Sequence, residues 1–184
     1  MIIPDEDFRK WPAYRCAEII YDGTVKFCER FLRRHLRLCD QMIHAARSGK
    51  QNIGEGSALS GTSKKAEIEL INVARASLLE LLLDYEDFLR QRDLKDWDKE
   101  HPTKRALRRL AYNSDKTYNT YRKYIEEGSA ELAANALICL IHQTRYLLEE
   151  LLLKLEQRFL TEGGFTERMY RMRVKARKSG RTLE

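Results

Sequence analysis

The chain has 184 residues, of which 43% are hydrophobic and 34% are charged, and its formal net charge at pH 7 is +6. That length suits one domain with a substantial core, and long runs of Ala, Leu, Glu, Lys and Arg with only three prolines favour helix almost throughout. The longest uncharged run, which begins at Leu132, is much shorter than the roughly 18 apolar residues of a membrane span, and the start lacks a signal-peptide pattern, so we expect a cytoplasmic protein without membrane contact.

Two helices are predicted in the first third of the chain. Pro12 suits the first turn of a helix, because the N–H group that it lacks would have no partner there. The basic cluster at 30–37 is the expected turn, although the pattern also allows one continuous kinked helix. Apolar periodicity then continues into the stretch 52–57, where Gly56 is expected just past the end of the second helix, in the left-handed conformation that glycine permits.

A long central helix is predicted to follow. Thr62 or Ser63 is expected to cap it by accepting a hydrogen bond from a free backbone N–H group, and Glu67 lies early, where the helix dipole favours an anion. Apolar residues spaced alternately by three and four form a heptad seam: Ile71, Ala74, Leu78, Leu81, Tyr85 and Phe88. A second apolar stripe lies beside this seam, so we expect the helix to be covered on two sides.

The segment after the central helix is predicted to be a helical insertion. The charged stretch 92–101 is expected to be a connection that ends at Pro102, and residues 113–115 are expected to split the helical pattern that follows, because their side chains offer local hydrogen bonds. Gly128 should end this segment, and a final helix should run from about Ser129 to Leu160.

The predicted fold is therefore all-α. Residues 1–162 are expected to form an up-down four-helix bundle with an added helical insertion at about 94–128, because the heptad seams are long and the helix breakers are few. Residues 163–184 form a basic C-terminal suffix, in which seven Lys or Arg and two Glu give a net charge of +5. The basicity of the protein is thus concentrated in its tail.

The chain also resembles a known family of bacterial proteins. The residues that carry the resemblance are Gln41, Ala45, Ala46, Ser48, Asn52, Ile53, Glu55, Gly56, Ser63, Glu67, Ala74, Arg75, Ser77, Leu78 and Glu80. They are similar to a pattern in four-helix-bundle proteins encoded in intervening sequences of 23S ribosomal RNA genes, and in the accessory variability proteins of diversity-generating retroelements. A weaker match lies at 140–148, and the ending after Glu162 resembles a suffix that some relatives carry.

The resemblance implies a four-helix protomer that assembles into a homopentamer and performs no catalysis. For the retroelement members it also implies binding of nucleic acid and of a reverse transcriptase. Independently of the resemblance, the apolar stripes of the central and final helices are wider than one neighbouring helix can cover, and such surface is rarely left open, so we expect a homo-oligomer.

Two basic segments are candidates for binding RNA or DNA, because Lys and Arg neutralise phosphates and release their counterions. The first is the tail, with Arg168, Arg171, Arg173, Lys175, Arg177, Lys178 and Arg181. The second lies in the insertion, with Lys104, Arg105, Arg108, Arg109, Lys116, Arg122 and Lys123. These residues are interleaved with tyrosines that could stack on unpaired bases, namely Tyr112, Tyr118, Tyr121 and Tyr124. The alternatives are a solvated, disordered tail and an insertion whose charges are merely solvated while its tyrosines lie in the core.

No enzyme, metal site or cofactor is expected. The residues that carry the family resemblance include five polar ones: Asn52, Glu55, Arg75, Ser77 and Glu80. They contain no visible pair of nucleophile and base. We expect Asn52 and Glu55 to satisfy helix ends or an arginine across the bundle. The four cysteines lack metal-ligand spacing and are expected to be buried free thiols, and His142 is expected to be a hydrogen-bonded core or interface residue.

Two functions remain open at this point. The first is a non-enzymatic nucleic-acid-binding accessory protein that assists a reverse transcriptase. The second is a protein-binding oligomeric scaffold, whose basic tail docks an acidic partner or keeps the assembly soluble.

Overall fold

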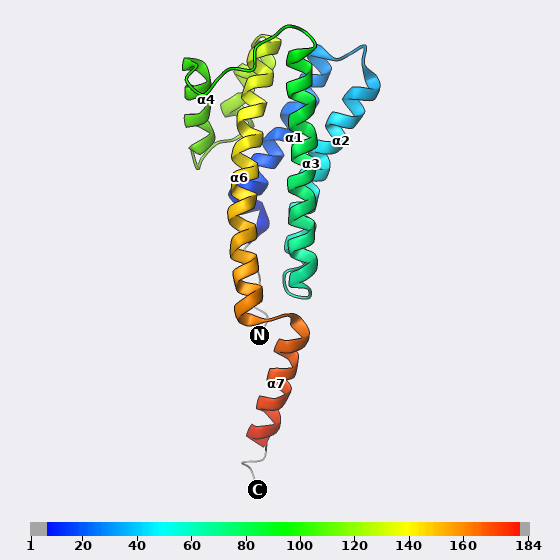
Figure 1. The fold of residues 1–184 in the computed structure, drawn as a ribbon, viewed down its shortest axis with the longest axis vertical. Helices are drawn as coiled ribbons and strands as arrows, with labels where there is room; N and C mark the ends of the chain where they lie inside the picture. The colour runs from blue at the N-terminus through cyan, green and yellow to red at the C-terminus, as the bar shows by residue number, and fades with distance from the viewer. Residues whose placement is uncertain (1–6, 181–184) are drawn as a thin grey trace.

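The computed structural model describes residues 7–180, and every regular element in this part of the chain is helical (Figure 1). The elements in chain order are η1 (Phe8–Lys10), α1 (Pro12–Phe31), α2 (Leu36–Leu59), α3 (Lys64–Arg90), α4 (Pro102–Tyr112), α5 (Tyr118–Arg122), the π-helical turn η2 (Lys123–Glu127), α6 (Ala130–Glu162) and α7 (Phe165–Gly180). The all-α prediction is confirmed. None of the helices described has the length and apolar content that crossing a membrane requires.

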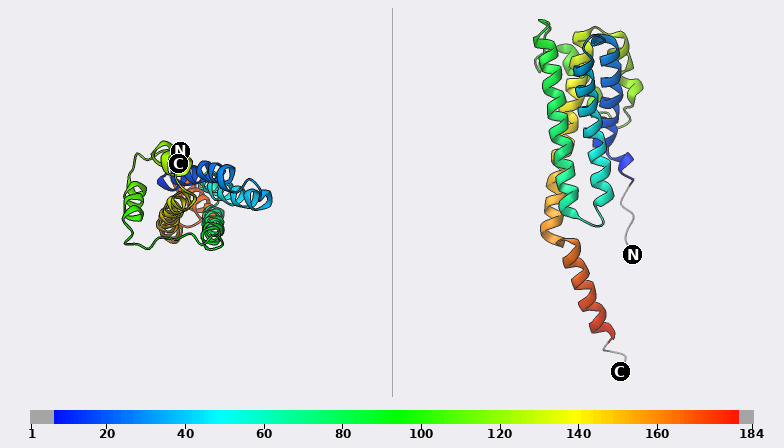
Figure 2. Two further views of the ribbon diagram at one scale, coloured as in Figure 1. Left: turned by 90° about the horizontal axis from the view of Figure 1, so that it is seen from above. Right: turned by 90° about the vertical axis from the view of Figure 1, so that its right-hand side faces the viewer.

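The four long helices contact one another in a ring, α1 with α2, α2 with α3, α3 with α6, and α6 with α1. Consecutive members of the ring run in opposite directions (Figures 1 and 2). The core between them contains the Phe27 ring, whose centroid lies 4.9 Å from that of Tyr85 and 4.8 Å from that of Phe88. The Tyr85 hydroxyl donates a hydrogen bond of 3.0 Å to Thr24 Oγ1, which itself donates to the Ile20 carbonyl, so these buried polar groups are paired.

The predicted end of the second helix at Gly56 is wrong. α2 continues through Gly56 to Leu59, and a Cβ atom at Gly56 would lie 3.3 Å from the Glu67 carbonyl oxygen and 3.3 Å from Ile71 Cδ1. The glycine therefore permits close approach of α2 to α3 and does not supply a left-handed turn. The reversal occurs at residues 60–63, and Ser63 caps α3 by accepting a hydrogen bond of 3.2 Å from the Ala66 N–H.

Most other predicted boundaries are confirmed. α1 ends at Phe31 and a turn precedes α2, so the continuous kinked helix is wrong. Pro102 begins α4, residues 113–117 separate α4 from α5, and the Ser129 hydroxyl caps α6 by accepting a hydrogen bond from the Leu132 N–H. Gly163, with a φ of 74°, ends α6 in a conformation that favours glycine.

The helices α4 and α7 lie outside the ring, as do the short elements η1, α5 and η2. α4 packs against the outer side of α6 (Figure 2, left). α7 continues beyond the end of α6, away from the ring (Figure 1). The expectation of a disordered tail is therefore wrong for residues 165–180, which form a helix.

Candidate nucleic-acid interface

α4 presents three arginines and a tyrosine on one exposed side. Arg105, Arg108, Arg109 and Tyr112 are related as i, i+3, i+4 and i+7, which places them on the same face of a helix. All four are exposed, and the Tyr112 side chain retains 64% of its accessible surface. The opposite side of α4 carries Leu107, which is fully buried against α6. Since α4 contains no Asp or Glu, its outer face is cationic along its whole length.

Lys104, which the sequence grouped with these arginines, has a different environment. Its side chain is only 12% exposed, and Nζ donates a hydrogen bond of 2.8 Å to the Asp96 carboxylate and another to the Trp97 carbonyl oxygen. A phosphate would have to compete with Asp96 for this ammonium group. Lys104 therefore stabilises the connection that leads into α4 and adds little to the exposed charge.

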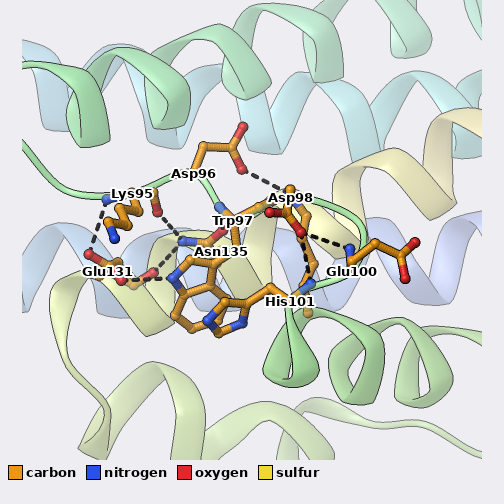
Figure 3. Close-up of polar contacts among 9 residues, drawn as sticks. Lys95, Asp96, Trp97, Asp98, Glu100, His101, Glu131 and Asn135 are labelled. Atoms are coloured by element: carbon orange, nitrogen blue, oxygen red, sulfur yellow. Dashed lines mark hydrogen bonds and ion pairs between the residues drawn. The ribbon is translucent and has the colours of Figure 1, made fainter.

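The connection before α4 is attached to α6 by Glu131 and Asn135 (Figure 3). The Glu131 carboxylate accepts hydrogen bonds from the Lys95 backbone N–H at 3.0 Å and from the Trp97 indole N–H at 2.7 Å. Asn135 accepts from the Trp97 backbone N–H at 3.0 Å and donates to the Lys95 carbonyl at 2.8 Å. The Trp97 ring also stacks on the His101 ring, with centroids 4.3 Å apart. These contacts fix the start of α4, and sequence reasoning missed them.

The electrostatics of this anchor are consistent with its geometry. Hydrogen bonds from the Lys95 backbone N–H and then from the Trp97 indole lower the pKa of Glu131, because both donors stabilise the ionised carboxylate. Glu131 is therefore an anion held by neutral donors, and its ionised carboxylate is the form that fixes the connection.

The tail residues lie on α7, the second cationic helix. Four of the predicted residues are described and exposed: Arg171, Arg173, Lys175 and Arg177. The side chains of Arg168 and Lys178, and all of Arg181, lie outside the described part of the structure. Tyr170 is 68% exposed and stands three and seven residues before Arg173 and Arg177, so these three share one face of α7. Met169 and Met172 are also exposed, and Met169 adjoins this face because it precedes Arg173 by four residues.

The two cationic helices lie at opposite ends of the molecule. α4 lies beside the end of the ring at which α6 begins, whereas α7 extends past the end at which α6 finishes (Figure 1). Within one protomer they therefore form two separate surfaces and not one continuous patch.

The tyrosines of the insertion divide between core and surface. Tyr121 is fully buried, and Tyr118 is partly buried, with its hydroxyl donating to Glu126 at 2.9 Å. Tyr124 is partly buried and packs near Leu107. Of these four, only Tyr112 keeps its ring largely in solvent. Burial in the fold, which was the alternative to base stacking, describes the other three better.

Residues that carry the family resemblance form structural contacts between α2 and α3. Asn52 Nδ2 donates to the Ser48 carbonyl at 2.8 Å and to Ser48 Oγ at 3.1 Å, and the Ser48 and Ser77 hydroxyls are 3.0 Å apart, so a polar chain links α2 to α3. Glu55 and Glu80 are exposed. The expectation that Asn52 and Glu55 satisfy a helix end or an arginine across the bundle is wrong, because α2 does not end there and Glu55 points to solvent.

A groove of about 450 Å³ separates the outer sides of α3 and α6. It is lined by Asn72, Arg75, Ala76, Leu79, His142, Arg145, Tyr146 and Glu149. Arg75 Nη1 lies 3.4 Å from Glu149 Oε1 across the groove, and the buried Nε atom of Arg145 has no hydrogen-bond partner among the described residues. His142 is exposed at this groove, so of the two expected environments the core is wrong, and an interface position stays a prediction. Partial burial in the groove, followed by the charges of Lys104 and Arg145, lowers the pKa of His142.

α3 and α6 also expose large apolar side chains, of which Leu79 and Tyr146 line this groove. Seven of them are exposed on α3 and α6: Val73, Leu79, Leu83, Tyr146, Leu153, Phe159 and Leu160. We call the outer side of these two helices the α3/α6 face. Its apolar content follows from the second stripe that the sequence places beside the seam of the central helix.

Of the cysteines, Cys139 packs in the same buried cluster as Leu107 of α4. All four are buried free thiols, as expected, and burial raises the pKa values of Cys16, Cys28 and Cys139, the last to about 11. Within residues 7–180, no three His, Cys, Asp or Glu side chains are grouped so that they could hold a metal ion.

Comparison of the chain with models of protein families, with curated proteins and with solved structures gives no match. The class that the fold and its surfaces define is an all-helical protein with two separated cationic helices. The relationship to the four-helix-bundle family described above rests on the sequence resemblance alone.

Proposed function

We propose that this chain is a cytoplasmic, non-enzymatic accessory protein that binds RNA or DNA through the outer face of α4 and through α7. Its protomer is an up-down four-helix bundle made of α1, α2, α3 and α6, into which α4, α5 and η2 are inserted. The observation that carries the proposal is the cationic face of α4. Three arginines occupy little more than one helical turn there, and among the described residues no carboxylate lies within ion-pair distance of them.

Several other basic residues on the ring helices form ion pairs with acids. Lys26 pairs with Glu29 at 2.8 Å, for example, and Arg90 pairs with Asp87 at 2.7 Å. Such pairs are typical of a solvated surface and contribute little to stability or to phosphate binding. The arginines of α4 differ from these pairs because their charges are not compensated and lie on one helical face, which is the arrangement that phosphate recognition needs.

The proposal includes self-association through the α3/α6 face. Both helices expose several large apolar side chains, and monomeric proteins rarely leave an extensive apolar surface open. A pentamer is the stoichiometry that the family resemblance suggests. In such an assembly every copy contributes an α4 and an α7, so weak contacts to one nucleic acid add through a high effective concentration.

The test is binding to a labelled single-stranded RNA and to a duplex DNA at about 50 and 200 mM salt. We expect the variant Arg105→Gln/Arg108→Gln/Arg109→Gln to bind more weakly and to lower the slope of log K against log salt by about 2 to 3, because each phosphate contact contributes about 0.7 to 0.9. Truncation after Leu160 removes α7 and should lower the slope further.

The matched control removes the same number of charges from paired positions, as Lys26→Gln/Lys65→Gln/Arg90→Gln. Each of these side chains lies against a carboxylate, Glu29, Glu69 or Asp87 respectively. The control should keep most of the affinity and nearly the full salt slope. Equal losses in the two triple variants would mean that net charge alone drives binding and that α4 is not a site.

A protein-binding scaffold is the second candidate, and the exposed methionines of α7 favour it. Met169 and Met172 lie on one side of a basic helix, an arrangement that suits docking into an apolar groove with acidic edges. The sequence resemblance suggests a reverse transcriptase as the partner. Absence of binding to either nucleic acid at low salt would support this candidate against the first.

A further inference from the structure

We propose that the nucleic acid bound by this chain is single-stranded, and that Tyr112 of α4 and Tyr170 of α7 are the platforms on which unpaired bases stack. This inference rests on the proposed function and specifies the substrate class of the same two surfaces.

The first argument is the exposure of the two rings. Most described tyrosines are buried or partly buried, and some have hydroxyls engaged within the fold, as Tyr85 has with Thr24 and Tyr118 has with Glu126. The three exposed tyrosines are Tyr112, Tyr146 and Tyr170. Tyr146 belongs to the α3/α6 face, where the proposed contact with another copy of the chain accounts for its exposure. Tyr112 and Tyr170 stand outside that face, and both rings remain open to a ligand.

The second argument is the position of Tyr112 on α4. It follows Arg105 by seven residues and Arg108 by four, so the ring and the guanidinium groups share one face over a length of about 10 Å. Tyr112 is also the last residue of the helix, and Asn113 adopts an extended conformation. The ring therefore stands at the open end of a row of phosphate-binding groups, where a base adjoining a bound phosphate can reach it.

α7 repeats this combination in the opposite chain order. Tyr170 precedes Arg173 by three residues and Arg177 by seven, again on one face, and all three side chains are exposed. Two helices at opposite ends of the protomer thus each combine one exposed aromatic ring with arginines at helical spacing.

The chemistry of this combination distinguishes single strands from duplexes. In a duplex the base faces are stacked on one another, so a surface tyrosine finds no face to bind and only the arginine–phosphate contacts remain. A single strand offers phosphates to the arginines and free base faces to the rings, and such stacking tolerates any sequence. The sites therefore favour single strands without reading a base sequence.

The experiment measures the affinity of the full chain for a 20-nucleotide RNA, a 20-nucleotide single-stranded DNA and a duplex DNA of that length, all at one salt concentration. The variants are Tyr112→Leu, Tyr170→Leu and the double variant, with Tyr112→Phe and Tyr170→Phe as matched controls that keep a stacking ring. Because both residues are exposed, circular dichroism should show unchanged helix in all of them.

We expect tighter binding of both single strands than of the duplex. Each leucine substitution should weaken single-strand binding about tenfold and leave duplex binding unchanged, whereas the phenylalanine variants should match the wild type. Binding that is equal for duplex and single strands, or that is unaffected by leucine, overturns the inference while the proposed function stands. Failure to bind any of the three nucleic acids overturns both.

Discussion

Replacing Glu131 should loosen the connection that holds α4 against α6. The Glu131 carboxylate accepts two hydrogen bonds, from the Lys95 N–H at 3.0 Å and from the Trp97 indole N–H at 2.7 Å. Hydrogen bonds to a charged group contribute about 1.5 to 3 kcal/mol each, and partial exposure places these at the lower end. We therefore expect Glu131→Ala to lower the free energy of unfolding by about 3 kcal/mol, and Glu131→Gln by about half of that, since its amide keeps one acceptor oxygen.

Urea denaturation followed by circular dichroism and by tryptophan fluorescence measures these changes. Glu127→Ala is the matched control, because Glu127 is an exposed carboxylate at the end of η2, close to Glu131 in the chain. It should change the free energy of unfolding by less than about 0.5 kcal/mol, as is usual for surface substitutions. If Glu131→Ala is no less stable than Glu127→Ala, the anchoring role of Glu131 is refuted.

The same anchor has a defined pH dependence. The folded state lowers the pKa of Glu131 below its ordinary value of 4.5, so its stabilising contribution is fully present above that value and is lost as the pH falls through the lowered pKa. The difference in unfolding free energy between the wild type and Glu131→Gln should therefore shrink when the pH is reduced from 7 towards 2.5. A difference that stays constant over this range would contradict the proposed role of the ionised carboxylate.

Two further predictions concern helix packing and assembly. A Cβ atom at Gly49 would lie 2.9 Å from two side-chain atoms of Leu78, so we expect Gly49→Ala to lower the free energy of unfolding by about 1 to 3 kcal/mol in urea denaturation. Gly61→Ala is the control and should be nearly neutral, because the space around Gly61 is open. Equal stabilities of the two variants would refute the close α2–α3 contact. If the chain self-associates as proposed, Leu83→Glu on the α3/α6 face should leave a 21.7 kDa monomer in light scattering, while Leu36→Glu, at the start of α2, should not. A Leu83→Glu variant that remains oligomeric would exclude this face as the interface.

The helices could be predicted from the sequence because their determinants are local. Pro12 and Pro102 begin helices where the missing N–H costs nothing, and Ser63 and Ser129 are suitable N-caps. Gly56 could not be assigned in this way. A glycine permits a left-handed turn or a close helix contact, and the two are distinguished only by the approach of α3, whose atoms lie 3.3 Å from the point that a Cβ atom of residue 56 would occupy.

The cationic sites could be predicted only in part. The shared face of the α4 arginines could be predicted from their helical spacing. The ion pair of Lys104 with Asp96 could not, because it depends on how the preceding connection folds back. The sequence could not show which of the four insertion tyrosines are buried and which are exposed, because the non-helical residues 113–117 interrupt the helical periodicity between Tyr112 and the other three. The anchoring by Glu131 depends on a contact between residues 34 and 36 positions apart, for which a lone tryptophan in a charged connection is the only signal.

The central claim, that α4 and α7 are nucleic-acid-binding surfaces, is tested most directly by ultraviolet crosslinking of a bound single-stranded RNA followed by mass spectrometry of the peptides. The basic cluster of Arg33, Arg34 and Arg37, at the turn between α1 and α2, serves as an internal control, because these arginines are also exposed but neither α1 nor α2 carries an exposed tyrosine. The account predicts crosslinks in residues 105–112 and 170–177, with few at the control cluster. Crosslinks concentrated at the control cluster, or spread evenly over the basic surface, would contradict it.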